Sequence, residues 1–126
     1  MALVEKSISG KIAQDFHRTG YDEADTLTTS WANKVVIKNK DFRNLGFTIR
    51  IDGGAIDGDY RVYGTYKPNA DTDVSGDEWQ EETASTALTR DVNVSAVITK
   101  PYDTIIIQAK ADSDTPAFKY WYRGMN

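Results

Sequence analysis

Residues 47–52 read FTIRID, and this short stretch decides the class of fold. Apolar side chains occupy every second position from Phe47 to Ile51, and polar side chains stand between them. Successive side chains of an extended strand point to opposite faces, so this alternation is typical of a strand with one buried and one solvated face. The residues that follow, DGGAIDG at 52–58, favour a tight turn because they combine glycine and aspartate. The stretch therefore predicts antiparallel β-structure.

Further segments with the character of short strands lie on both sides of this stretch. They are rich in β-branched or alternating residues and occur at 34–38, 60–65, 79–84, 92–99, 104–110 and 118–122. Glycine, proline, aspartate or asparagine separates most of them, and no long helical pattern intervenes. The pattern predicts an all-β protein: a single antiparallel β-sandwich or jelly-roll-like domain of about seven to eight strands over residues 31–126.

The first 30 residues differ from the rest of the chain. Ile8, Ile12 and Phe16 have the spacing of one helical face, although Gly10 lies among them and weakens a helix. Residues 19–30 are polar and rich in threonine. We interpret residues 1–30 as an N-terminal arm that holds at most a short strand or helical turn.

The composition excludes several classes of protein. The chain has 126 residues, no cysteine and a single histidine, His17, which rules out a disulfide framework and sites with several Cys or His ligands. The 15 basic residues are outnumbered by 19 acidic ones and are spread along the chain, which argues against nucleic-acid binding. No run approaches the roughly 18–20 apolar residues of a membrane helix. We therefore expect one domain with no nucleic-acid or membrane partner.

One stretch matches a metal-binding motif. Residues 71–82, DTDVSGDEWQEE, have the spacing of a calcium loop, with Gly76 at its sixth position. The candidate ligands are Asp71, Asp73, Ser75 and Glu82. A calcium loop of this type joins two helices, whereas this one follows a strand pattern, and its residues are also those of an ordinary hairpin loop. We predict a solvated loop and no cofactor.

The residues give no support to an enzymatic site. The nucleophile motif G-x-S-x-G is absent, and His17 lies in the predicted arm. The aspartates fall in turn-like stretches, where they bond to their own backbone. We therefore expect no catalytic activity.

Aromatic residues are the remaining signal, since the chain has three tryptophans and seven tyrosines. Trp121 lies on the opposite face of its predicted strand from Phe118, Tyr120 and Tyr122, between Lys119 and Arg123. Both faces of this strand are thus predicted to be partly covered. Aromatic side chains are enriched at protein interfaces, so we favour a contact with a subunit or partner at Trp121 over a platform for sugars.

The order of segments resembles a known class of proteins. The run KVVIKNKDFRNLGFTIRIDG, then YRVYGTY, then PYDTIIIQAKAD and FKYWYRG, is similar to small β-sandwich virion proteins of tailed bacteriophages. These are capsid decoration (cement) proteins and related head or tail accessory domains. The resemblance implies a non-enzymatic virion subunit that is assembled in the host cytoplasm. It also implies a homo-oligomer that binds the major capsid protein or other virion proteins.

This resemblance gives the N-terminal arm a role, because an arm can add a strand to the open sheet edge of a neighbour. The interface is then expected to include Leu3, Val4, Ile8, Ile12, Phe16 and Trp121. The alternative hypothesis is a carbohydrate- or receptor-binding β-sandwich module of a phage tail or surface protein.

Overall fold

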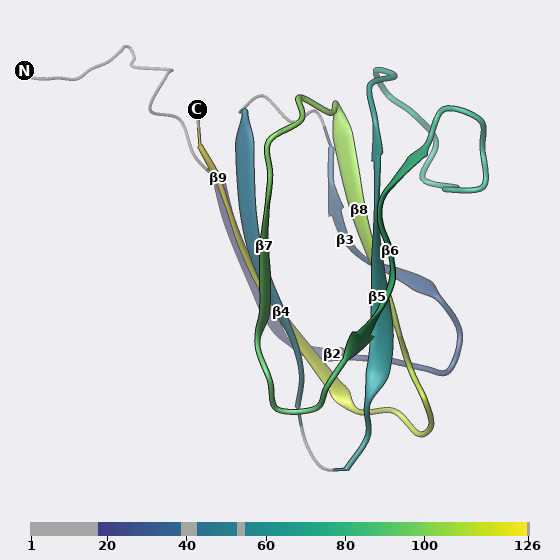
Figure 1. Ribbon diagram of the computed structural model, residues 1–126, viewed down its shortest axis with the longest axis vertical. Coiled ribbons are helices and arrows are strands. Elements are labelled where there is room, and N and C mark those ends of the chain that lie inside the picture. Colours follow the sequence, from purple (N-terminus) through teal and green to yellow (C-terminus); the bar gives the residue numbers. More distant parts are fainter. Residues whose placement is uncertain (1–17, 39–42, 53–54, 126) are drawn as a thin grey trace, which may run out of the picture.

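The computed structural model describes residues 18–38, 43–52 and 55–125 of the chain. These residues form a sandwich of two four-stranded antiparallel sheets, which face each other in Figure 1. They contain no helix, and hence none long and apolar enough to cross a membrane. The predicted all-β sandwich is confirmed.

Each sheet interleaves strands from distant parts of the sequence. One sheet has the order β2 (Arg18–Thr26), β9 (Ala117–Met125), β4 (Asn44–Asp52) and β7 (Val94–Ile98). The other has the order β3 (Ala32–Ile37), β8 (Thr104–Ala111), β5 (Gly58–Thr65) and β6 (Gln80–Leu88). Within this series only β5 and β6 are successive strands paired in one sheet, because every other connection crosses between the sheets. This order of strands is that of a jelly roll.

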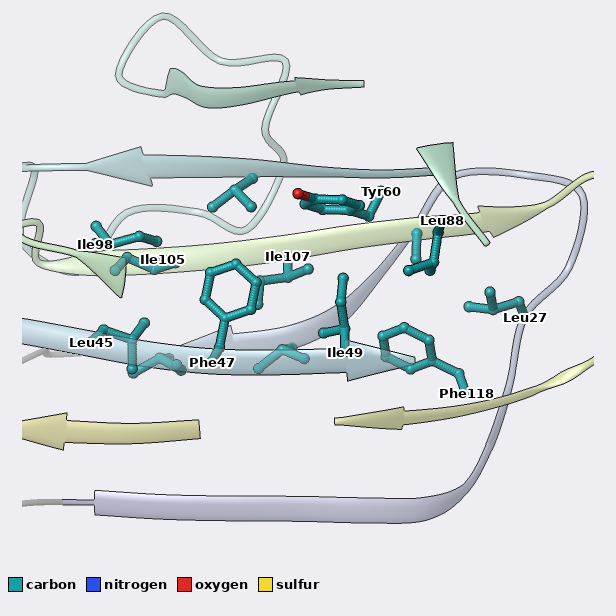
Figure 2. Packing of buried hydrophobic residues seen from close by; sticks show 14 of the residues in the cluster. Leu27, Leu45, Phe47, Ile49, Tyr60, Leu88, Ile98, Ile105, Ile107 and Phe118 are labelled. Carbon is teal, nitrogen blue, oxygen red and sulfur yellow. The ribbon is translucent and has the colours of Figure 1, made fainter. Parts of the chain in front are cut away.

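The core lies between the two sheets and follows the alternation of the strands. Phe47, Ile49 and Ile51 of β4 are at most 4% exposed, as their spacing in the sequence predicts. Figure 2 shows Phe47 pointing across the sandwich toward Ile107 of β8. Each fully buried side chain of this size contributes roughly 1.5–3 kcal/mol, so the packing of β4 against β8 is a large part of the stability.

Strand β8 is buried on both of its faces. Ile105 and Ile107 belong to the core, whereas Ile106 points to the outer side of its sheet and is also 0% exposed. Ile106 is covered by Ala70 and Trp79, which belong to the connection between β5 and β6. That connection therefore forms a second, small apolar cluster on the outside of the sandwich.

Strand β2 and the residue after it belong to the sandwich, in contrast to the predicted arm of residues 1–30. β2 pairs with β9 along its length, from Arg18 opposite Gly124 to Thr26 opposite Ala117, and Leu27 is fully buried in the core. The boundary predicted at residue 30 is therefore too late. An edge strand is held by backbone hydrogen bonds to one neighbour, and a polar, threonine-rich sequence does not reveal them.

A glycine in β5 makes room for a large side chain from the connection between β7 and β8. A Cβ atom added to Gly64 would collide with the ring of Tyr102, which is 1% exposed. The hydroxyl of Tyr102 donates a hydrogen bond of 2.7 Å to Glu82 in β6. Burial raises the pKa of this hydroxyl above its usual value, and the neighbouring Glu82 raises it further. Tyr102 thus joins β5, β6 and the β7–β8 connection.

This packing predicts that Gly64→Ala lowers the free energy of unfolding by about 1–3 kcal/mol, because Tyr102 must shift to admit the methyl group. Gly46→Ala is the matched control, since its added Cβ meets only the carbonyl oxygen of Arg123 at 3.9 Å. We expect that control to be neutral or slightly stabilising. Urea unfolding of both variants measures the difference, and equal effects would contradict this account of Gly64.

Candidate interaction surface

The free edges of the two sheets differ in how they are protected against pairing with another chain. Strands β2, β3, β6 and β7 are the four edges. The pairings of β2, β3 and β6 each contain a register shift, and all three strands carry charged residues. Natural proteins use such bulges and charges to block edge-to-edge association.

Strand β7 has neither a register shift nor a charged residue. It reads VSAVI, without charge or proline, and it pairs with β4 in regular register from Val94 to Ile98. Val97 is 67% exposed, the largest exposure among the large apolar side chains in the described ranges. The backbone groups on the far side of β7 face no further strand of this sheet. Among the four edges, β7 is thus the one open to pairing.

The outer face next to β7 carries the tryptophan that the sequence indicated. Trp121 of β9 is 39% exposed and lies directly opposite Thr48, which in turn lies opposite Ser95 of β7. The hydroxyl oxygens of Thr48 and Ser95 are 2.6 Å apart, so one hydroxyl donates to the other. This row of short polar side chains joins Trp121 to the β7 edge.

The neighbouring row of residues on the same face has a glycine, with no side chain, at its middle position. Gly46 lies opposite Arg123 on one side and Val97 on the other. The space above Gly46 is open, because an added Cβ would meet only one atom, at 3.9 Å. Trp121 and Val97 therefore stand on either side of a strip of small residues.

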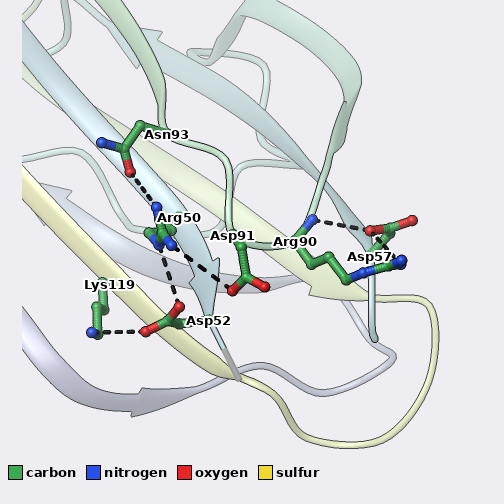
Figure 3. Close-up of polar contacts among 7 residues, drawn as sticks. All are labelled: Arg50, Asp52, Asp57, Arg90, Asp91, Asn93 and Lys119. Atoms are coloured by element: carbon green, nitrogen blue, oxygen red, sulfur yellow. Dashed lines mark hydrogen bonds and ion pairs between the residues drawn. The ribbon is translucent and has the colours of Figure 1, made fainter. Parts of the chain in front are cut away.

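Ion pairs fix the connection that leads into β7, as Figure 3 shows. Arg50 of β4 donates to Asn93 at 3.2 Å and to Asp52 at 3.3 Å. The backbone N–H of Asp91 donates to the carbonyl of Ile51 at 2.8 Å. These contacts hold the β6–β7 connection against the end of β4, so they set the position of the β7 edge.

Asp52 is the electrostatic centre of this group. Lys119 of β9 contacts its carboxylate at 2.8 Å, and Arg50 contacts the other oxygen. The hydrogen bond from Lys119 is the main reason that the pKa of Asp52 falls to about 2. Asp52 thereby ties β4 to β9 on the outer face.

The predicted calcium ligands are not gathered around one point. Asp73 accepts hydrogen bonds from the backbone N–H and the hydroxyl of Ser75, which lower its pKa. Asp71 accepts from the backbone N–H of Asp73. Glu82 lies on β6, where Tyr102 and Lys100 contact it. No group of three or more potential metal-ligating His, Cys, Asp or Glu side chains occurs among the residues that the structure describes.

The sequence did not indicate a stacked cluster on the outer face of the other sheet. The guanidinium of Arg61 lies 4.2 Å from the ring centre of Trp31 and 5.3 Å from that of Tyr63. Its Nε donates to Gln108 at 2.7 Å, and Gln108 donates to Asn33 at 2.8 Å. Only the alternation of Arg61 and Tyr63 in β5 hinted at a shared face. The stack and its hydrogen bonds cover part of this face from within the chain, whereas Val36 on the same face is 40% exposed.

The other predicted interface residues, Leu3, Val4, Ile8, Ile12 and Phe16, lie outside the described residues. Trp121 is therefore the one member of that set whose position is known. The role of these side chains as an interface stays a prediction.

Comparison with known proteins gives one structural similarity. No protein-family model and no curated protein matches the chain. A solved structure described as a Bacillus endospore appendage, from a family of disulfide-linked pili, is similar over 90% of this chain and 91% of that one. The sequence identity is 16% and the TM-score is 0.49. The present chain has no cysteine and cannot form the disulfides of such pili.

The comparison corrects the predicted function. The similar structure comes from a bacterial appendage, which is a different structural role from decorating a phage head. The prediction of a phage capsid decoration protein is therefore wrong, and the alternative on the same line, a carbohydrate- or receptor-binding β-sandwich module of a phage tail or surface protein, is not carried further. The virion partners and location that accompanied it stay predictions, and nothing below depends on them.

The pKa of Asp52 predicts a pH dependence. Its carboxyl is more acidic in the folded chain than its ordinary value of 3.8, so it stabilises the fold above about pH 4 and loses this effect as the pH falls toward 2. Asp52→Asn should therefore lower the free energy of unfolding at pH 6–7 and have little effect near pH 2. Urea unfolding at both values measures this, and a pH-independent difference would contradict it.

The separated positions of the candidate ligands predict that the loop at 71–82 binds no calcium. The melting temperature should be the same in millimolar calcium and in excess chelator, because no ion is bound to the folded state. Differential scanning fluorimetry checks this. A rise in calcium that Asp73→Asn removes would restore the calcium-site hypothesis.

Proposed function

We propose that this chain is a non-catalytic structural subunit that associates with copies of itself through the edge of β7. The observation that carries the proposal is the contrast among the sheet edges: β7 alone has neither charge nor register shift in the described sandwich. A flat and uncharged edge is a template for pairing with another strand.

The side chains around this edge support association. Val97 and Trp121 are both large, apolar and exposed, and small residues lie between them on the same face. Aromatic side chains contribute strongly at interfaces, where they bury a large area at a small cost in conformational entropy. A partner that pairs with β7 would also cover Val97.

The edge is held in position before any partner arrives. Arg50 holds the connection before β7 through Asn93 and Asp91, and Tyr102 holds the connection after it through Glu82. The backbone N–H of Asp103 also donates to the carbonyl of Thr65 at 2.7 Å. A strand held at both ends loses little freedom on pairing, which reduces the entropic cost of association.

The proposed partner is a second copy of the chain. The edge has no charge to select a partner of opposite charge, and its recognition would come from the backbone and small side chains, which every copy shares. Symmetric association of identical chains is the commonest route to soluble oligomers.

The proposal predicts that Val97→Lys weakens self-association at least tenfold without affecting the fold. The side chain at this position is exposed, so lysine is tolerated in the monomer, but it places a charge at the edge where a partner would bind. Sedimentation velocity over a range of protein concentrations measures the association.

Val92→Lys is the matched control, because Val92 is 49% exposed and lies outside β7. It adds the same charge to the chain and should leave association unchanged. A wild-type chain that stays monomeric up to millimolar concentration, or equal effects of the two variants, would refute the proposal.

A further inference from the structure

The five residues of β7 are arranged about a small central residue, Ala96. Val94, Ala96 and Ile98 lie opposite core residues of β4, so these three side chains share the inward face of the sheet. Ser95 and Val97 alternate with them and share the outward face. Reversing the direction of the strand about Ala96 exchanges Val94 with Ile98 and Ser95 with Val97. Each face of β7 therefore keeps its own residues when the strand is reversed.

Symmetry limits how two copies can pair this edge. A two-fold axis that stands perpendicular to the sheet between two edge strands makes those strands antiparallel. Residues directly opposite each other in an antiparallel pair point to the same face, so the outward face of one copy continues the outward face of the other. A two-fold contact also requires that, if one residue lies opposite a second, the second lies opposite the first. One residue of β7 must then lie opposite its own counterpart.

One choice of that residue uses the whole strand. With the axis at Ala96, all five residues of β7 pair with the five residues of the second β7. Moving the axis by one residue shifts the two strands by two residues. An axis at Ser95 or Val97 would therefore leave only three residues of each strand paired with the other strand. Backbone hydrogen bonds hold an added edge strand, so the longest overlap is favoured.

We propose that two copies of the chain pair β7 with β7 in antiparallel register about Ala96. This inference rests on the proposed self-association and specifies its geometry. The two four-stranded sheets that end at β7 become one continuous sheet of eight strands, with the order β2-β9-β4-β7 followed by the same strands of the partner in reverse. The contact closes on itself, because each copy gives and receives the same edge.

On the outward face, this register joins the two rows of side chains described above. Val97 lies opposite the partner's Ser95, which ends the row that contains Thr48 and Trp121. Val97 itself ends the row that contains Gly46. The 67% exposed side chain of Val97 is then covered in part by the partner. No charged residue of either strand faces this contact.

On the inward face, the smallest side chain lies at the axis. Ala96 is exposed in the single copy and lies opposite Phe47 of β4. In the proposed register it lies opposite the partner's Ala96, where two methyl groups fit between the strands without a clash. Val94 lies opposite the partner's Ile98 on the same face, so an apolar pair stands on each side of the axis.

Cysteine cross-linking tests the register, because the native chain has no cysteine to interfere. Directly opposite residues of an antiparallel pair have Cα atoms about 4.5–5.5 Å apart, a separation that a disulfide can bridge. Full-length Ala96→Cys under mild oxidation should therefore give a disulfide-linked homodimer on a non-reducing gel. A mixture of Ser95→Cys chains with tagged Val97→Cys chains should give the heterodimer in preference to either homodimer.

Matched controls separate this contact from random collision. Val92→Cys and Thr99→Cys place the thiol at exposed positions on either side of β7. In the proposed register Thr99 lies six residues along the strand from its own counterpart, a separation of about 20 Å. Each control should give at least tenfold less homodimer than Ala96→Cys. Equal yields from Ala96→Cys and the two controls would overturn the inference.

The same variants identify the other arrangements. A homodimer formed best by Ser95→Cys or by Val97→Cys alone would place the axis at that residue and overturn the register about Ala96. A parallel pairing would cross-link Thr99→Cys as readily as Ala96→Cys and would also overturn it. If Val97→Lys weakens association but Ala96→Cys does not cross-link, the proposed function stands and this inference fails. If the wild-type chain stays monomeric up to millimolar concentration, both fail.

Discussion

The burial of β8 on both faces is the constraint on which the rest of the structure depends. On the inner face, Ile105 and Ile107 meet the side chains of β4, and on the outer face Ile106 would be exposed if nothing covered it. The β5–β6 connection supplies that cover through Trp79, whose indole N–H donates to the carbonyl of Asp71 at 3.0 Å. The loop that resembles a calcium site in sequence therefore has a packing role. Its residues Asp71 and Asp73 accept hydrogen bonds from the backbone of the same loop.

The outer faces of the two sheets are covered in different ways. The outer face of the β8 sheet is occupied by the Trp79 cluster and by Arg61 stacked on Trp31. On the other sheet, the described residues around Gly46 leave Trp121 and Val97 exposed. The cover of the β8 sheet is partial, since Val36 on the same face is 40% exposed. Because the connections on both sides of β7 are fixed, the open edge is a rigid element of the fold.

Local alternation predicted most of the strands, and long-range pairing explains what it missed. The strand from Phe47 to Ile51 was predicted correctly because its buried positions hold apolar residues and the positions between them hold polar residues. β2 was missed because its order comes from backbone bonds to β9, nearly a hundred positions away in the sequence. The Arg61 stack brings together residues from β5, β8 and the start of β3, so no spacing in the sequence could reveal it. Trp121 was predicted to contact a subunit or partner because it is an aromatic residue on the polar face of its strand; the structure places it on the outer face, 39% exposed, and the contact stays a prediction.

The size of β7 limits how the copies can associate. A strand of five residues offers only a few outward hydrogen bonds, each worth roughly 0.5–1.5 kcal/mol net, against an association cost of about 4–15 kcal/mol for two free proteins. Edge pairing by itself would therefore be weak, and burial of the exposed Val97 and Trp121 beside the edge would have to add to it. Antiparallel pairing of β7 with β7 of a second copy would be self-complementary, so it would give a closed two-fold dimer in which both edges are used.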